Sequence, residues 1–350
     1  MKALFIGLGG IGQRHLRILK SIYPNIKVAA VRVRGNVFEI NDDLKINKKL
    51  NIIEKFNITN FSSISEALDF NPDFAIVANP TSMHVSTTTE LIKNKIPVLL
   101  EKPISNNIIG VKNLLKISKK NKVPVMIGYM MRFNPCVIKL KEYIDNNLLG
   151  RLYSIIVTIN SYMPNWHKYE KYNSFYAGQK KLGGGVVLTE IHELDLLNWF
   201  FGKPKKISAI GGKLSNLNLD VEDTVSILME HKINNRPIPA NLNMSFVQKA
   251  PIRKFLILGE FGSIEWDIIK NTLRLDNYQK KIHREHKYPK FLRNDMFKKQ
   301  MEHFINSIKN KKKPITSLDR VIDGHLTALV IKKAIQVDKF IKVKQKFKNI

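Results

Sequence analysis

A glycine-rich segment near the start of the chain places the strongest constraint on its fold. Ala3–Ile6 is a short apolar run of the kind that forms a buried parallel strand. The run is followed by G-L-G-G-I-G, which reads G-x-G-x-x-G, and a helical pattern then begins. Gly7 allows a tight turn, Gly9 lets the backbone approach a pyrophosphate, and Gly12 lets the helix pack close to the strand. The turn also leads into a helix N-terminus, which favours phosphate binding. We therefore predict a dinucleotide-binding turn made of Gly7, Gly9, Gly10, Ile11 and Gly12.

The end of the second predicted strand bears on which dinucleotide is bound. Residues 26–33 are rich in Val and Ala and read as a strand. About twenty residues past the glycines, an acidic residue usually binds the ribose hydroxyls of NAD. This chain has Arg32 and Arg34 instead, and a guanidinium can bind a 2′-phosphate that a carboxylate would repel. The pattern favours NADP over NAD. In the alternative interpretation both arginines are surface charges, and Asn36 or a later group meets the ribose.

Apolar strand patterns alternate with helical patterns in the first part of the chain. Further strands are predicted at 73–78, 97–100 and 123–127, with helices at 63–70, 84–94 and 108–121. This alternation predicts a doubly wound parallel sheet, a Rossmann fold, with its ligand crevice at the carboxyl ends of the strands. The turns 79–81, 101–103 and 129–132 all fall at such ends.

The pattern changes from Tyr129 onward. Strand patterns recur without intervening helices at 152–159, 206–211, 224–230, 240–245, 254–259 and 263–268. One helix is predicted at 188–201, and two more at 295–309 and 317–337. Such an order predicts an α+β domain with a mostly antiparallel sheet. We therefore expect two domains, 1–128 for the dinucleotide and 129–350 for substrate and oligomerisation, with the last helices able to pack back on the first.

The chain is strongly basic, with 58 Lys+Arg against 29 Asp+Glu and a formal charge of +29. One interpretation is a surface for nucleic acid or membrane. We favour a composition rich in Lys, Asn and Ile, because the densest runs, 309–313 and 339–348, are short and lie far in sequence from the glycine turn. The single cysteine excludes an internal disulfide, and no apolar run reaches membrane-spanning length. A cytoplasmic protein without nucleic-acid or membrane partners is expected.

The order of several motifs resembles the Gfo/Idh/MocA family, the group of glucose–fructose oxidoreductase and inositol dehydrogenase. Besides the glycine turn, the matching motifs are Asn79-Pro80-Thr81 with His84, Glu101-Lys102-Pro103, Gly128-Tyr129 with Arg132-Phe133, and Gly183–Gly185 ahead of His192. The resemblance implies hydride transfer between a nicotinamide and a ring carbinol carbon of a sugar-like substrate. Residues 12–17 and the loop 166–176 further resemble members found among surface-polysaccharide genes, which favours a sugar or nucleotide sugar.

The resemblance also implies a catalytic residue, Lys102, whose amine meets the reacting oxygen. A lysine at the carboxyl end of a strand could exchange a proton with substrate. In the alternative interpretation Lys102 only pairs with a neighbouring carboxylate. Pro103 would fix the direction of the turn, with a cis peptide bond as one possibility.

His192 is the second catalytic candidate. Thr189, His192 and Asp195 recur at three-residue spacing, which predicts a shared helix face. Family members commonly carry an acid before this histidine, but Thr189 stands at that position here with Glu190 beside it, so the identity of the acid stays open. His192 could instead be structural. A zinc helix is not expected, because Leu196 stands where a second histidine would be needed.

Other residues are expected to bind rather than react. The resemblance implies cofactor contacts from Asn79, Pro80, Thr81, His84, Glu101 and Lys102. Thr189 and His192 are expected to contact the substrate as well. Substrate contacts are expected from Tyr129 and Arg132, whose fork suits a carboxylate or phosphate, and from Trp166 and Tyr176, which could stack on a sugar or simply pack. A homo-oligomer, dimer or tetramer, is expected by likeness alone. The alternative function is a non-catalytic nucleotide- or nucleic-acid-binding regulator that retains the fold.

Overall fold

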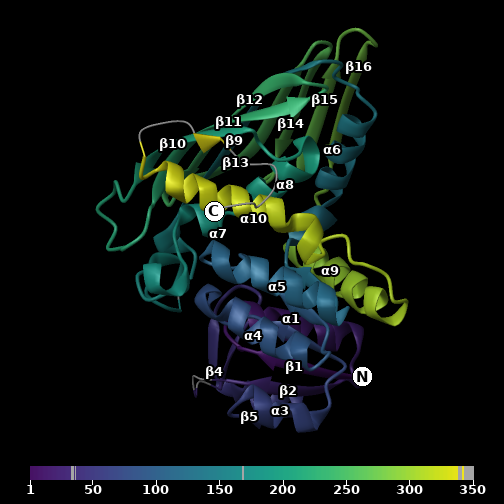
Figure 1. Ribbon diagram of the computed structural model, residues 1–350, viewed down its shortest axis with the longest axis vertical. Coiled ribbons are helices and arrows are strands. Elements are labelled where there is room, and N and C mark those ends of the chain that lie inside the picture. Colours follow the sequence, from purple (N-terminus) through teal and green to yellow (C-terminus); the bar gives the residue numbers. More distant parts are fainter. Residues whose placement is uncertain (33–34, 36, 168, 338–340, 343–350) are drawn as a thin grey trace.

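Short buried strands that alternate with helices form a parallel sheet in the first part of the chain (Figure 1). The computed structural model describes residues 1–32, 35, 37–167, 169–337 and 341–342. The sheet order is β5-β2-β1-β6-β7-β8, and every pairing in it is parallel, as predicted. Its strands are β1 (Lys2–Ile6), β2 (Lys27–Val31), β5 (Ile58–Phe61), β6 (Phe74–Val77), β7 (Val98–Leu100) and β8 (Val125–Ile127). Its helices are α1 (Gly10–Ile22), α2 (Ile52–Phe56), α3 (Ile64–Ala67), α4 (His84–Lys93) and α5 (Ile108–Asn121).

The strand order of this sheet reverses at β1. The chain runs outward through β2 and β5, then returns to β6 on the other side of β1. The backbone N–H of Ala78 donates to the Ile6 carbonyl at 2.9 Å, and that of Gly7 donates to the Val31 carbonyl at 3.1 Å. The turns after β1 and β6 are thereby held side by side. A reversal of this kind opens a crevice at the carboxyl ends of the strands.

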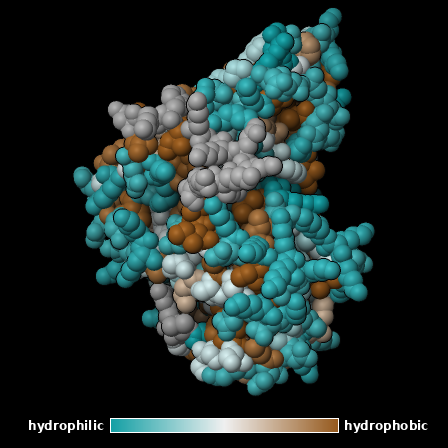
Figure 2. Space-filling view, in the orientation of Figure 1, coloured by the Kyte–Doolittle hydropathy of each residue, from teal (hydrophilic) through white to brown (hydrophobic). Residues whose placement is uncertain are grey.

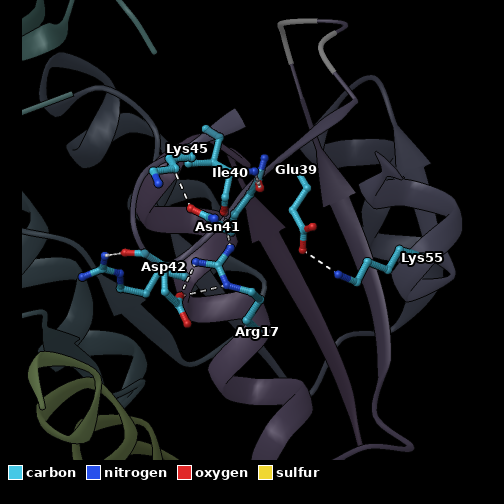
Figure 3. A network of polar contacts seen from close by, with 9 residues as sticks. Arg17, Glu39, Ile40, Asn41, Asp42, Lys45 and Lys55 are labelled. Atoms are coloured by element: carbon cyan, nitrogen blue, oxygen red, sulfur yellow. Dashed lines mark hydrogen bonds and ion pairs between the residues drawn. The ribbon is translucent and has the colours of Figure 1, made fainter. Parts of the chain in front are cut away.

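A small hairpin of β3 (Phe38–Ile40) and β4 (Ile46–Asn51) follows β2 and is tied to α1 (Figure 3). From α1, Arg17 donates through Nε to Asp42 Oδ1 at 3.0 Å, and its Nη1 donates to the Ile40 carbonyl. On the other side, Lys55 Nζ lies 2.6 Å from Glu39 Oε1. These contacts fix the hairpin beside the carboxyl ends of the parallel strands.

The second sheet lies in the upper half of Figure 1 and has the order β16-β15-β14-β13-β9-β12-β11-β10-β17. Its pairings are antiparallel except for β9 with β12, so the predicted mostly antiparallel sheet is confirmed. Its strands are β9 (Leu152–Tyr162), β10 (Lys206–Gly212), β11 (Thr224–Ile233), β12 (Arg236–Ser245), β13 (Val247–Gly259), β14 (Gly262–Asp267), β15 (Thr272–Asn277), β16 (Ile282–Lys287) and β17 (Ile341–Lys342).

Two features of this second lobe differ from the sequence-based prediction. Strands β15 and β16 extend the sheet beyond the predicted patterns. β16 is a largely exposed strand whose polar residues give no apolar alternation, whereas β15 is mostly buried and its short alternation was not recognised. The helix predicted at 188–201 is broken into α7 (Val186–Thr189) and α8 (His192–Phe201). The break lies at Glu190, whose φ of −95° and ψ of 38° leave the helical region.

The last helices connect the two lobes. The remaining helices are α6 (Pro135–Asp145), α9 (Arg293–Lys309) and α10 (Leu318–Ala334). Helix α9 packs on α1, and α10 contacts α5, α8 and β10, so it crosses between the two sheets in Figure 1. Thr316 Oγ1 donates to the Ile127 carbonyl at 2.8 Å, and the Ile127 N–H donates to the Thr316 carbonyl at 2.9 Å. The segment before α10 is therefore hydrogen-bonded to the edge strand β8.

The surface view in Figure 2 shows hydrophilic side chains over most of one face, around smaller hydrophobic patches. Among the helices that the structure describes, none has the length and apolar character needed to cross a membrane.

Candidate active site

A cavity of about 1590 Å³ lies between the two lobes and gathers most of the predicted site residues. Its wall includes the glycine turn, the turns after β6 and β7, the loop 166–176 and the break between α7 and α8. The predicted residues that line it are Gly7, Gly9, Gly10, Ile11, Arg32, Asn79, Pro80, Thr81, His84, Glu101, Lys102, Trp166, Tyr176, Thr189 and His192. One cavity therefore brings the predicted cofactor turn and both catalytic candidates together.

The glycine turn has the form needed to hold a pyrophosphate. Helix α1 begins with Gly9 as its N-cap, no side chain caps it, and no acidic residue occupies its first turn. A Cβ atom on Gly9 would meet no atom within 4 Å, whereas one on Gly12 would lie 2.3 Å from the Gly7 carbonyl oxygen. Gly9 thus leaves open space for a ligand, and Gly12 lies against the strand rather than on the cavity wall. An uncapped helix N-terminus attracts phosphate, so these residues fit a dinucleotide.

The turn after β6 carries Asn79, Pro80 and Thr81 to the edge of the same cavity. Asn79 donates through Nδ2 to Thr87 Oγ1 at 2.9 Å, while its Oδ1 is buried without a hydrogen-bond partner in the described part of the chain. His84 lies between carbonyl oxygens, with Nδ1 2.7 Å from Pro103 O and Nε2 2.9 Å from Asn79 O. Burial lowers the pKa of His84, and the neutral ring has a single N–H, so it donates to only one of these two carbonyl oxygens at a time. The ring is nevertheless packed between the turns after β6 and β7.

Glu101 is buried at the base of the cavity and is paired with a residue that the sequence analysis did not single out. Its Oε1 lies 2.7 Å from His15 Nε2, on α1. Burial raises the pKa of the Glu101 carboxyl, but the His15 hydrogen bond and the charges of His15 and Lys102 outweigh it and hold the pKa below its ordinary value. Glu101 is therefore an anion beside Lys102.

Arg32 lines the cavity next to the β3–β4 hairpin, from which Phe38, Ile40 and Ile46 also contribute to the wall. Its position after β2 is the one at which sequence reasoning expected a ribose-binding group. Arg34, the other residue of that prediction, lies outside the described residues.

Lys102 follows β7 and reaches across to the second lobe. Its Nζ donates to the Thr189 carbonyl at 2.7 Å, and its backbone N–H donates to Glu101 Oε2 at 3.1 Å. The Lys102–Pro103 peptide bond is cis. Burial raises the pKa of the nearby Tyr176 hydroxyl, and the charge of Lys102 acts against that rise. The Lys102 amine is thus held on the cavity wall by a carbonyl oxygen and next to a phenol.

His192 begins α8 and is buried on the same wall. Its Nδ1 has no hydrogen-bond partner among the described residues, and the Tyr129 ring meets it edge-on with centroids 5.9 Å apart. Burial, together with the positive charges of Lys102, Arg253 and Arg293, lowers the pKa of His192 well below its ordinary value. The imidazole is therefore neutral at physiological pH and can donate or accept a single proton.

The broken helix changes which side chains face the cavity. Because the chain leaves the helix at Glu190, Thr189 and Glu190 both line the cavity, although a continuous helix would turn Glu190 away. Glu190 lies 3.5 Å from Arg253 Nη2, and Arg253 Nε donates to Glu193 Oε1 at 2.5 Å. Asp195, expected on the same face as His192, is absent from the cavity wall. The acid that most closely precedes His192 in the chain is thus Glu190, already paired with Arg253.

The structure does not support the expected substrate contacts of Tyr129 and Arg132. Tyr129 is fully buried, and burial raises the pKa of its hydroxyl well above the ordinary value. Arg132 is directed into the second lobe, where it binds Asp195, while Met130 and Met131 of the same turn line the cavity. Sequence position at a strand end does not reveal which way the next turn points its side chains.

The aromatic loop closes one side of the cavity. Trp166 donates through Nε1 to Ser161 Oγ at 3.1 Å, and its ring meets Phe246 edge-on. Trp166 therefore both packs against its neighbours and lines the cavity. Tyr169, which the site prediction omitted, lies so close to the glycine turn that a Cβ atom on Gly10 would be 2.7 Å from its hydroxyl oxygen.

Sequence reasoning also missed three further arginines of the cavity, Arg14, Arg253 and Arg293. They come from α1, β13 and the first position of α9. Arg14 lies within the matching segment 12–17 but was not assigned a role, and no local motif marks the other two. Within the described residues, no group of three His, Cys, Asp or Glu side chains has the arrangement of a metal site.

Comparison with known proteins identifies the family. Residues 1–129 match the model of an oxidoreductase family with an NAD-binding Rossmann fold, GFO_IDH_MocA, and residues 137–265 match the GFO/IDH/MocA C-terminal domain. The chain belongs to the Gfo/Idh/MocA oxidoreductase family. Both lobes match, so the resemblance on which the sequence analysis relied is confirmed.

Curated relatives within this family are distant and match only in part. The rhizopine catabolism protein MocA of Rhizobium meliloti is 26% identical over 57% of this chain and 56% of its own length. The myo-inositol 2-dehydrogenase of Thermotoga maritima is 28% identical over 65% of this chain and 64% of its own. The putative oxidoreductase YteT of Bacillus subtilis is 28% identical over 40% of this chain and 32% of its own. The matched regions thus span between about a third and about two thirds of these relatives.

Solved structures of the family share the whole fold. The WlbA dehydrogenase of Bordetella pertussis, in complex with NADH and UDP-GlcNAcA, has a TM-score of 0.79 at 18% identity, with 99% of each chain covered. The myo-inositol 2-dehydrogenase of Lactobacillus plantarum also has a TM-score of 0.79 at 18% identity, covering 98% of this chain and 99% of that one. At these identities the likeness concerns the fold alone.

Proposed function

We propose that this protein is a nicotinamide-dependent oxidoreductase that transfers a hydride to or from a ring carbon of a sugar or nucleotide sugar. The observation that carries the proposal is the cavity, in which the glycine turn, Lys102 and His192 share one wall. Relatives named as inositol dehydrogenases, and the neighbour bound to NADH and UDP-GlcNAcA, support the substrate class. A role in surface-polysaccharide synthesis is part of the proposal and rests on residues 12–17 and the loop 166–176.

The residues divide the work between binding and proton transfer. When bound, a nicotinamide supplies or accepts the hydride. In the oxidation direction the Lys102 amine takes the proton of the substrate hydroxyl, and in the reduction direction it returns that proton to the carbonyl oxygen. The Thr189 carbonyl holds the amine in position through the 2.7 Å hydrogen bond. His192, neutral because of its burial, donates or accepts a hydrogen bond at the same substrate.

The cofactor we propose is NADP in preference to NAD. The support is Arg32, which lines the cavity at the position where NAD-binding proteins usually carry a carboxylate. The family model describes an NAD-binding fold, and the neighbours bind NAD⁺ or NADH, so NAD remains the second cofactor to test.

A direct test mixes the purified full chain with NADPH or NADH and follows nicotinamide fluorescence. Binding in the micromolar range is expected, with NADPH tighter. Turnover is then sought with panels of sugars and nucleotide sugars in both reaction directions. If neither reduced cofactor nor its oxidised form binds, the proposal is overturned.

A further inference from the structure

Arg293 differs from the other arginines that line the cavity. It occupies the first position of α9. Its side chain lines the cavity and is exposed to solvent there. Within the described part of the chain, no hydrogen bond or ion pair engages its guanidinium. Arg253, by contrast, contacts Glu190 and Glu193, and Arg14 donates to the Asp42 carbonyl at 3.3 Å.

The charges around Arg293 add to its isolation. Burial and the nearby positive charges of Arg14 and Arg253 lower its pKa to about 10, although the charges of Glu190 and Glu101 act against this change. Both of these carboxylates already have other partners, which are Arg253 for Glu190 and His15 for Glu101. Placing a third guanidinium in such a cavity costs free energy unless an anion completes it.

The position of Arg293 favours a substrate over a cofactor as the source of this anion. The glycine turn already offers an uncapped helix N-terminus to a pyrophosphate. Arg293 lies where the two lobes meet, close to Arg14 of α1 and Arg253 of β13, and its positive charge also acts on His192. An anion at Arg293 would therefore belong to the molecule that His192 also contacts.

We propose that the substrate carries an acidic group, a carboxylate or a phosphate, which binds to Arg293. This inference rests on the proposed function and narrows its substrate class to acidic sugars and nucleotide sugars. The sequence predicts that Arg132 binds an anion of the substrate. The inference assigns this role to Arg293, which lines the cavity, instead of Arg132, which does not. The guanidinium geometry allows two parallel hydrogen bonds to either kind of anion.

The test measures binding of defined probes to the full chain by calorimetry, with and without saturating NADPH. The probes are UDP for a diphosphate, D-glucuronate for a carboxylate, and D-glucose as the neutral comparison. We expect at least one anionic probe to bind more tightly than glucose, and Arg293→Gln to weaken that probe about tenfold or more. A loss confined to UDP assigns a phosphate, and a loss confined to glucuronate assigns a carboxylate.

Two further arginine variants test whether the loss of probe affinity is specific to the guanidinium of Arg293. Arg293→Lys should retain part of the affinity, and Arg236→Gln, an exposed arginine at the start of β12, should leave it unchanged. Thermal melts check that each variant is folded. The inference is overturned if Arg293→Gln binds the probes like the unmodified chain, if all probes bind alike, or if the variant loses as much affinity for NADPH as for the probes. Failure of both NADPH and NADH to bind would instead contradict the proposed function, and the affinities of the probes measured without cofactor would still test the inference.

Discussion

Arg132 and Asp195 form a buried ion pair with two parallel hydrogen bonds. Arg132 Nε donates to Asp195 Oδ2 at 2.8 Å, and Nη2 donates to Oδ1 at 2.7 Å. The guanidinium also lies 4.7 Å from the centre of the Trp199 ring. The two side chains are only 5% and 1% exposed, so each depends on the other for its charge to be tolerated inside the protein.

Arg132→Gln should therefore destabilise the fold by about 3–5 kcal/mol, because it leaves the Asp195 carboxylate buried without its cation. Urea unfolding followed by circular dichroism measures the change. Arg284→Gln, on the exposed edge strand β16, should change the free energy of unfolding by less than about 0.5 kcal/mol. If Arg132→Gln were as stable as the unmodified chain, the Arg132–Asp195 ion pair would not contribute to the stability of the fold.

Lys102→Met should lower kcat by roughly a hundredfold or more while leaving cofactor affinity within about twofold, because it removes the exchanging proton and keeps the side-chain length. The measurements are steady-state kinetics and NADPH fluorescence titration. Lys93→Met, at the exposed end of α4, is the control and should behave like the unmodified chain. A fully active Lys102→Met would remove that residue from the chemistry.

Two glycine variants separate ligand binding from folding. Gly9→Ala places its methyl group in open space at a φ of −74°, so the protein should fold normally but bind NADPH more weakly, since that space faces the phosphate site. Gly12→Ala would place a carbon 2.3 Å from the Gly7 carbonyl oxygen, so it should lower the melting temperature. Melting curves and titrations of both variants test this; unchanged binding by Gly9→Ala would argue against a pyrophosphate at the turn.

Arg32→Asp should shift the ratio of NADP to NAD affinity toward NAD by at least tenfold, because a carboxylate repels the 2′-phosphate and accepts hydrogen bonds from ribose hydroxyls. Arg32→Gln should lose NADP affinity without gaining NAD affinity. Fluorescence titrations with both reduced cofactors give the ratio, and a constant ratio in both variants would show that Arg32 does not discriminate between them.

Two buried histidines predict a loss of stability in acid. Burial lowers the pKa of His231 to about 4 and that of His325 to about 3, against an ordinary value near 6.5. At a pH between the lowered pKa of each folded histidine and the ordinary value near 6.5, the unfolded chain therefore binds more protons than the folded one. Stability should fall as the pH drops from 6.5 toward 4, by up to about 1.4 kcal/mol per pH unit for each histidine.

Urea midpoints at several pH values measure this slope. His231→Gln keeps a donor for the Gly202 carbonyl, which now lies 2.8 Å from His231 Nδ1, and it should flatten the curve between pH 6.5 and 4. A variant curve parallel to the original would contradict the assignment.

Local patterns were sufficient to predict most strands of the parallel sheet in the first lobe, but not the β3–β4 hairpin or β5. The apolar runs that became β1, β6 and β7 are buried along their length, apart from the half-buried Lys2, and α5 spans the predicted residues 108–121. The parallel direction of the strands follows from the alternation of strands and helices, because parallel strands need long crossovers. Likewise, the turns that form the cofactor side of the cavity follow directly from the ends of those strands.

The remaining features depend on contacts between distant parts of the chain. The Glu193–Arg253 hydrogen bond joins residues 60 positions apart, and no pattern around Arg253 or Arg293 indicates that they meet at one cavity. The break at Glu190 is equally hidden, since the apolar periodicity of 188–201 continues through it. For the same reason the inward direction of Arg132 could not be read from its position after β8.

The pairing of Thr316 with Ile127 restricts how the two lobes can move. Helix α9 packs on α1, and Thr316 then pairs with the edge of β8, so the chain is bound to the first lobe before and after residues 310–315. Helix α10 leaves this edge and contacts α8 and β10 of the second lobe. Widening of the cavity to admit a large ligand would therefore move the second lobe about the start of α10, while α9 stays with the first lobe.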